Sequence, residues 1–214
     1  KSMADRIDWL EEKSTTQLFT GHLGSGKSTE LRGLKSELEN RGYFVSLLDA
    51  VEEIDLADVE YTDILLAVAR GLERDLREKG LELDPRLLDN IAMWFAEVVY
   101  ERTDKKALEA EFSAELKVGV STPPVLPFFA RVLTRITGQV KTGAEIRKNI
   151  RRRLDPQIFL LIDNINLLLA AASAAVRKKD WKGPAIIFDN LEKIPLSEKK
   201  GGPTRSDQAG ARFS

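Results

Sequence analysis

Three short runs along the chain predict β-strands. Their sequences are TQLFT at residues 16–20, YFVSLL at residues 43–48 and GPAIIFDN at residues 183–190. The first is rich in β-prone residues, whereas the other two are continuously apolar, as is typical of parallel strands covered on both faces. Asp49 directly follows the second run, and Asp189 lies near the end of the third. We therefore expect a parallel sheet with three strands.

Apolar residues at three- and four-residue spacing predict helices over most of the remaining chain. The expected helices cover residues 28–40, 64–80, 85–99, 128–136, 142–154 and 155–179. Pro85 is expected to begin the third helix, and Asp155 followed by Pro156 is expected to cap the start of the last. The acidic segment 52–63 contains no basic residue, so we expect a solvated loop there.

The order of these elements predicts an α/β fold. We expect three layers, α/β/α, around a parallel sheet, with a mainly helical insertion at about residues 85–180. Within the insertion, residues 114–121 alternate like a strand, and the prolines that follow break any regular element. The domain is expected to span residues 1–194, and residues 195–214 are expected to form a polar loop or tail.

Composition and charge narrow the classes of function. The chain has 214 residues, with 33 basic and 34 acidic side chains, so its net charge does not favour a nucleic-acid partner. It has no cysteine and one histidine, which exclude disulfides, thiolate zinc sites and multi-histidine metal sites. Any bound metal must therefore be held by oxygen atoms.

Nothing at the start of the chain resembles a secretory leader, so we expect a cytoplasmic protein. The most lipid-like stretch is residues 158–176, which is long enough to consider as a membrane span. It contains Asp163, Asn164 and Asn166 near its middle, and polar residues are costly in a bilayer. We therefore expect a buried helix there and no membrane span. The apolar residues expected on its buried face are Ile158, Ile162, Ile165, Leu169, Ala172 and Val176.

Residues 21–28, GHLGSGKS, fit the phosphate-loop pattern G-x-x-x-x-G-K-[ST]. They lie between the first predicted strand and the first predicted long helix, as the mechanism requires. Glycines allow backbone N–H groups to surround a phosphate, and the helix N-terminus adds a favourable dipole. Lys27 is expected to neutralise the β- and γ-phosphates, and Ser28 to bind Mg²⁺. The residues expected at the nucleotide are Gly21, His22, Leu23, Gly24, Ser25, Gly26, Lys27, Ser28 and Thr29.

The third predicted strand ends in a candidate metal-binding carboxylate. Asp189 follows the apolar run Ile186 to Phe188, and an acid at this strand end typically orders Mg²⁺ beside a phosphate loop. Asn190 stands next, where a glutamate often activates water, which favours slow hydrolysis. Glu192 can replace that glutamate, or Asn190 can orient the water by hydrogen bonding. Glu192 as an ordinary exposed loop acid is an equally good interpretation.

The segments FTGHLGSGKSTEL and IIFDNLEKIP resemble bacterial P-loop ATPases of the broad AAA/STAND-like group. The resemblance covers residues 16–40 and 183–195. It implies a three-layer P-loop NTPase core with a parallel sheet of about five strands, and ATP with Mg²⁺ as cofactors. The long separation of Lys27 from Asp189 implies the helical insertion. Because no sensor strand, lid domain or arginine finger is assignable after Glu192, we expect an incomplete core and suspect a fragment.

The motifs predict a Mg²⁺-dependent ATPase with slow hydrolysis that drives a conformational or assembly switch. Self-association or a protein partner is expected to complete the site. One alternative is a regulatory module that binds nucleotide without hydrolysing it. Another is a motor stimulated by nucleic acid, in which the basic run Arg147, Lys148, Arg151, Arg152 and Arg153 supplies the contacts or an arginine finger. A solvated helix face is the commoner role for such a run.

Overall fold

Two parallel strands form the centre of the fold. The computed structural model describes residues 3–9, 15–22, 24–100 and 127–195, together with the isolated positions Lys106 and Ala110. Within these residues, the strands β1 (Phe44–Asp49) and β2 (Pro184–Asp189) pair in register, from Phe44 opposite Pro184 to Asp49 opposite Asp189. The strands predicted at residues 43–48 and 183–190 are therefore confirmed.

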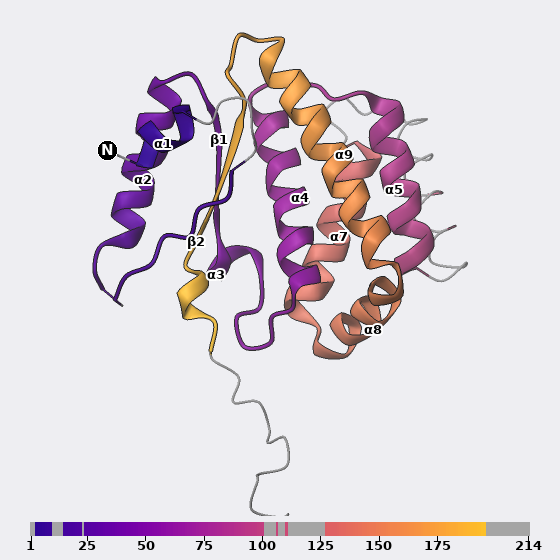
Figure 1. The fold of residues 1–214 in the computed structure, drawn as a ribbon. Helices are drawn as coiled ribbons and strands as arrows, with labels where there is room; N and C mark the ends of the chain where they lie inside the picture. Colours follow the sequence, from indigo (N-terminus) through magenta and orange to yellow (C-terminus); the bar gives the residue numbers. More distant parts are fainter. Residues whose placement is uncertain are drawn as a thin grey trace, which may run out of the picture.

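The rest of the described chain is mostly helical. The helices are α1 (Met3–Trp9), α2 (Lys27–Asn40), α3 (Ala50–Glu53), α4 (Tyr61–Glu78), α5 (Pro85–Val99), α7 (Phe128–Thr142), α8 (Ala144–Leu154) and α9 (Ile158–Arg177), with the short 3-10 turns η1 (Asp155–Gln157) and η2 (Leu191–Lys193). Figure 1 shows α1 and α2 on one side of the sheet and the other long helices on the opposite side. The fold therefore has α/β character, with a small sheet between helices.

The strand predicted at residues 16–20 is wrong. Residues 15–22 are irregular, and they pair with neither strand of the sheet. A strand is stable only when a neighbour accepts and donates its backbone hydrogen bonds. Leu18 is 86% exposed, while Phe19 packs against the small apolar cluster beside α2. The contact of Phe19 with this cluster holds the segment near the sheet, but the segment does not form a strand.

Most predicted helices are confirmed, with shifted ends. Helix α4 begins three residues before the predicted start because Glu60 and Asp63 form a reciprocal capping box. Helix α5 begins at Pro85 as predicted, with the Asp84 side chain accepting from the backbone N–H of Arg86. Helix α7 continues to Thr142, beyond the predicted end at residue 136, because Thr137 and Val140 also lie in the core.

The predicted helix cap at Asp155 is wrong. Asp155 has helical dihedral angles, φ −53° and ψ −45°, and it ends α8 instead of preceding α9. The 3-10 turn η1 joins the two helices, and Pro156 fits there because its fixed φ suits a helical first turn. Residues from α8 to α9 therefore form one nearly continuous helical run.

The main hydrophobic core lies on the α4 side of the sheet. It joins α4, α5, α7, α8 and α9 with Phe44 of β1. A smaller cluster lies on the α2 side, and its buried members are Ala4, Leu31, Leu38, Tyr43, Val45 and Ile187. The helices predicted as an insertion therefore share their core with α4, which precedes them.

Helix α9 is less buried than its sequence predicts. Its buried residues are Leu161, Ile165, Leu168, Ala172 and Val176, whereas Ile162, which was expected inward, is exposed. In the part of the chain that the structure describes, Ala144–Arg177 is one helix long and apolar enough to cross a membrane, judged by length and composition alone. Only 22% of its most apolar window is buried.

Some predictions lie outside the described residues. These are the strand-like pattern at residues 114–121, residues 196–214 of the predicted tail, and Leu23 of the phosphate loop.

Candidate functional site

The candidate phosphate loop connects the irregular segment 15–22 to α2. Gly24 and Gly26 have positive φ angles of 78° and 83°, which L-residues with a Cβ rarely adopt. The backbone N–H of Ser25 donates to the carbonyl oxygen of His22 at 3.1 Å, so the loop makes a tight turn. Gly26 then precedes the first residue of α2, Lys27. The glycines are thus at the positions where the backbone must turn.

Lys27 is the buried cation of this loop. Its side chain is 8% exposed, and its Nζ donates to the carbonyl oxygens of Gly21 at 3.1 Å and His22 at 2.9 Å. The lysine therefore folds back over the loop that precedes it. His22 is exposed, and it contacts Lys27 through its backbone carbonyl oxygen. Ser28 and Thr29 follow in the first turn of α2, half-buried and exposed respectively.

Lys27 also contacts the other predicted half of the site. Its Nζ lies 3.3 Å from Oε1 of Glu192, which is in the turn η2 directly after β2. The pKa of Glu192 is lowered, chiefly by a hydrogen bond with its own backbone and further by Lys27. Glu192 is therefore ionised at neutral pH. Two candidate residues separated by most of the chain meet through this ion pair.

Two aspartates lie at the same edge of the sheet. Asp49 and Asp189 are partners in the strand register, so both carboxylates are at the carboxyl ends of β1 and β2. Asp189 is buried, and its Oδ1 accepts from the backbone N–H of Asn190 at 2.7 Å. Ligands of parallel α/β sheets bind at this edge. The predicted metal residue Asp189 therefore has a second carboxylate beside it.

Asn190 connects the two strand ends. Its backbone is left-handed, with φ 64°, a conformation that asparagine adopts more readily than most residues. Its side-chain Nδ2 donates to Oδ1 of Asp49 at 2.9 Å, and the same oxygen accepts from the backbone N–H of Val51 at the start of α3. Asp49 was not among the predicted site residues. The signal for it is the similar pattern of the two strands, since each is an apolar run that ends in aspartate.

The described residues contain no group of three or more histidine, aspartate or glutamate side chains that could hold a metal ion. Ser28 and Asp189 supply two side chains with oxygen ligands for the predicted magnesium. Mg²⁺ usually keeps several water ligands and binds one or two protein groups together with phosphate oxygens. This donor set fits magnesium that arrives with a nucleotide, and it does not fit a metal held by protein atoms alone.

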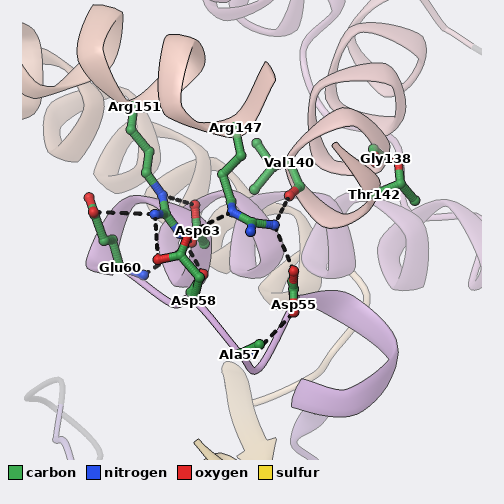
Figure 2. A network of polar contacts seen from close by, with 10 residues as sticks. All are labelled: Asp55, Ala57, Asp58, Glu60, Asp63, Gly138, Val140, Thr142, Arg147 and Arg151. Carbon is green, nitrogen blue, oxygen red and sulfur yellow. Dashed lines mark hydrogen bonds and ion pairs between the residues drawn. The ribbon is translucent and has the colours of Figure 1, made fainter. Parts of the chain in front are cut away.

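The basic run on α8 has a different role from the predicted one. The side chains of Arg147 and Arg151 are each 5% exposed, and Figure 2 shows both guanidinium groups among carboxylates of the preceding acidic segment. We call these residues the arginine cluster; its members are Arg147, Arg151, Asp55, Asp58, Glu60 and Asp63. A solvated helix face is therefore wrong for these two arginines. The solvated loop predicted at residues 52–63 is confirmed in part: residues 54–60 form a loop with exposed Asp58 and Glu60, whereas Glu53 and Asp63 are buried.

The contacts of the arginine cluster are specific. Arg147 donates to Asp55 at 2.8 Å and to Asp58 at 3.1 Å, and also to the carbonyl oxygen of Val140. Arg151 donates to Asp58 at 3.0 Å and pairs with Asp63, which is itself buried at the start of α4. A buried charge is stable only when it is paired and hydrogen-bonded. The cluster thus ties the loop after β1 to α8.

No protein family, no curated protein and no solved structure matches the sequence or the fold.

Proposed function

We propose that this chain is a P-loop nucleotide-binding protein that binds ATP with Mg²⁺ and hydrolyses it slowly. The observation that carries the proposal is the ion pair between Lys27 and Glu192, because it joins the phosphate loop to the acidic end of β2. A loop with left-handed glycines, a helix that starts at a lysine, and a parallel sheet edge with two aspartates support it.

Each residue has a role in this proposal. The backbone N–H groups from Gly21 to Thr29 surround the phosphates, and Lys27 neutralises the charge that develops on them. Ser28 and Asp189 order the magnesium ion, which supplies electrostatic stabilisation of the phosphates when it is bound. Glu192 accepts a proton from the attacking water, or Asn190 orients that water through its amide.

The present partners of Lys27 explain how nucleotide binding would act as a switch. The Lys27 ammonium group is satisfied by two loop carbonyl oxygens and by Glu192. A phosphate carries more negative charge than these partners, so it competes for the same ammonium group. Glu192 would then lose its cation and change position. The binding of ATP is thereby coupled to a movement of η2.

A module that binds nucleotide without hydrolysis is the second candidate. The observation that favours it is Asn190, which stands next to Asp189 and donates to Asp49. An amide cannot accept the proton of an attacking water as a carboxylate can. Turnover would then depend on Glu192 alone. Loss of turnover with retained binding in Glu192→Gln supports the ATPase, and equal, negligible turnover in both proteins supports the module.

A motor stimulated by nucleic acid has less support. Arg147 and Arg151 are buried among carboxylates, so they are not available to phosphates on a nucleic-acid backbone. Lys148 and Arg152 of the same run are exposed. Stimulation of turnover by DNA or RNA, lost in a variant with Lys148→Glu and Arg152→Glu, would revive this function.

The decisive experiment is a calorimetric titration of the chain with ATP and with ADP in the presence of Mg²⁺. We expect binding in the micromolar range, and its loss in Lys27→Ala, because the lysine supplies the phosphate cation. Lys35→Ala is the matched control, since Lys35 lies on the same helix and pairs with Glu39, at 3.9 Å on the surface. Equal binding by wild type and Lys27→Ala, or no binding by a folded wild-type chain, contradicts the proposal.

A further inference from the structure

Helix α9 has two faces of different composition. Its inward face is buried in the main core, as described above. Its outward face is a continuous stripe of exposed residues, and we call it the α9 stripe. The members of the stripe are Phe159, Asp163, Asn166, Leu167, Ala170, Ala174 and Arg177. They recur at three- and four-residue spacing, so they lie along one side of the helix. In Figure 1, α9 lies between α4 and α5 at the front of the helical side.

The stripe and its borders carry four exposed large apolar side chains. Phe159 is 80% exposed and Leu167 is 51% exposed, and Leu160 and Ile162 at its borders are exposed as well. Single exposed apolar residues are common on soluble proteins, but a contiguous group on one helix marks a contact surface. The stripe is therefore expected to be covered by another molecule.

The order of residues along the stripe is self-complementary. Asp163 and Arg177 are each seven residues from Ala170, one toward each end of α9. When a second copy of α9 packs antiparallel across Ala170, Asp163 lies opposite Arg177 of the second copy, and Arg177 lies opposite its Asp163. The same symmetry places Leu167 opposite Ser173 of the second copy, and Asn166 opposite its Ala174. Each acidic side chain therefore lies opposite a basic one, and each large side chain opposite a small one. The two-fold axis repeats both contacts.

The local structure permits both contacts. Among the described residues, Arg177 donates only its Nε, to the carbonyl oxygen of Lys182 at 3.3 Å, so its terminal amino groups remain for a carboxylate. Alanine at positions 170 and 174 lets two helices approach to about 8 Å, the short end of the usual range. Asp163, Asn166 and Arg177 are costly in a lipid bilayer, so the stripe suits a protein surface better than a membrane.

We infer that the chain forms a symmetric homodimer through antiparallel packing of α9 against α9 of a second copy, with Ala170 on the two-fold axis. This interface is independent of the proposed nucleotide site. Each subunit contributes the same patch to the contact, as a closed two-fold dimer requires.

The first test is the mass of the full 214-residue chain, measured by light scattering and sedimentation over roughly 1 to 100 µM. We expect a monomer–dimer equilibrium that Leu167→Arg weakens by more than about tenfold, because a buried arginine without a partner is costly. Ile146→Arg is the matched control, since Ile146 is an exposed apolar residue outside the stripe, 47% exposed on α8. Circular dichroism confirms that both variants fold.

The charge pair gives a second test with internal rescue. Asp163→Arg and Arg177→Asp should each weaken the dimer, because each places like charges opposite one another. The double variant exchanges the two charges and should restore the dimer. Failure of the rescue, with both single variants folded, overturns the antiparallel arrangement.

The absence of cysteine from the sequence makes the two-fold axis testable by disulfide formation. Ala170→Cys should form an intermolecular disulfide rapidly, because the two sulfur atoms meet at the axis. Ala174→Cys is the matched control. Position 174 lies four residues from the axis on each subunit, so the two sulfur atoms are about 12 Å apart along the helices, too far for a disulfide. Equal cross-linking of the two variants overturns the proposed register.

Two further results would overturn the inference as a whole. One is a chain that stays monomeric over the full concentration range, with Leu167→Arg indistinguishable from wild type. The other is a monomer that co-sediments with phosphatidylcholine vesicles and loses this binding in Leu167→Arg, since the stripe would then face lipid.

Discussion

The two sides of the sheet differ in how they are held together. On the α2 side, a cluster of a few apolar residues packs under one long helix, and the phosphate loop lies at its start. On the α4 side, five helices share one continuous core, and the arginine cluster fastens the loop after β1 to α8. Because segments with few buried contacts open most easily, we expect the α2 side to open more readily than the α4 side. The α4 side supplies the rigid support.

The charged residues on the two sides also differ in their partners. Lys27 is held by two carbonyl oxygens and a half-exposed glutamate, partners that a stronger anion can replace. Arg151 is held by several carboxylates, among them the buried Asp63. In the proposed function Lys27 exchanges its partners, whereas Arg151 keeps its own. The following predictions test that division, from the largest expected effect to the smallest.

Removal of Arg151 should have the largest effect on stability. Arg151→Ala leaves the carboxylate of Asp63 buried without its cation, so we expect the free energy of unfolding to fall by about 3 to 5 kcal/mol. Urea denaturation followed by circular dichroism measures the change. Arg152→Ala, at the neighbouring exposed position, should stay within about 0.5 kcal/mol of wild type. Equal effects of the two variants would show that the arginine cluster contributes little.

Alanine at two helical glycines should have opposite effects on the two sides. A Cβ at Gly71 of α4 would overlap the side chain of Leu48, which is buried in β1 and cannot move freely, so Gly71→Ala should destabilise the fold by about 1 to 3 kcal/mol. A Cβ at Gly33 of α2 meets no atom within 4 Å. Gly33→Ala should therefore stabilise the fold by up to about 1 kcal/mol. If the denaturation midpoints of Gly71→Ala and Gly33→Ala move in the same direction, the expected difference between the two positions is wrong.

Acid should weaken the arginine cluster through Asp58. The hydrogen bond from Arg151 is the main cause that lowers the pKa of Asp58 below its ordinary value of 3.8. A lowered folded-state pKa contributes stability that is complete above the unfolded value and disappears as the pH falls through the folded value. Wild type and Asp58→Asn should therefore differ most near neutral pH and converge below pH 3.8.

The difference between wild type and Asp58→Asn should stay below about 1 kcal/mol, because the Asp58 side chain is 48% exposed. Unfolding curves of both proteins at several pH values measure it. A difference that grows toward low pH would show that the aspartate is not stabilised as an anion.

The parts of the fold that depend on nearby residues could be predicted from the sequence. The apolar runs at β1 and β2 and the helical spacing of α2 and α5 are local patterns, and the structure has these elements within one or two residues of the expected ends. The strand expected at residues 16–20 failed because a strand also needs a neighbour, which its own residues do not specify. The arginine cluster was missed for the same reason, since its partners lie far apart in the sequence.

The candidate site divides in the same way. The glycine turns of the phosphate loop follow from their residue types, and the two acidic strand ends follow from short runs. The pairing of Lys27 with Glu192 and of Asn190 with Asp49 depends on how β2 and α2 meet in space. Sequence patterns identified Lys27, Glu192 and Asn190 as candidates and placed Asp49 at the end of the second strand without a role. Only the tertiary fold determines which of them touch.

The register of the sheet has a consequence for how the protein folds. Phe44 pairs with Pro184, so the two strands are separated by most of the described helices. Closing so long a loop costs entropy that local contacts do not repay, and native pairings between distant residues slow folding. During synthesis the candidate phosphate loop emerges well before Asp189 and Glu192. We therefore expect the candidate site to assemble only after the helical side has formed the surface on which β2 docks.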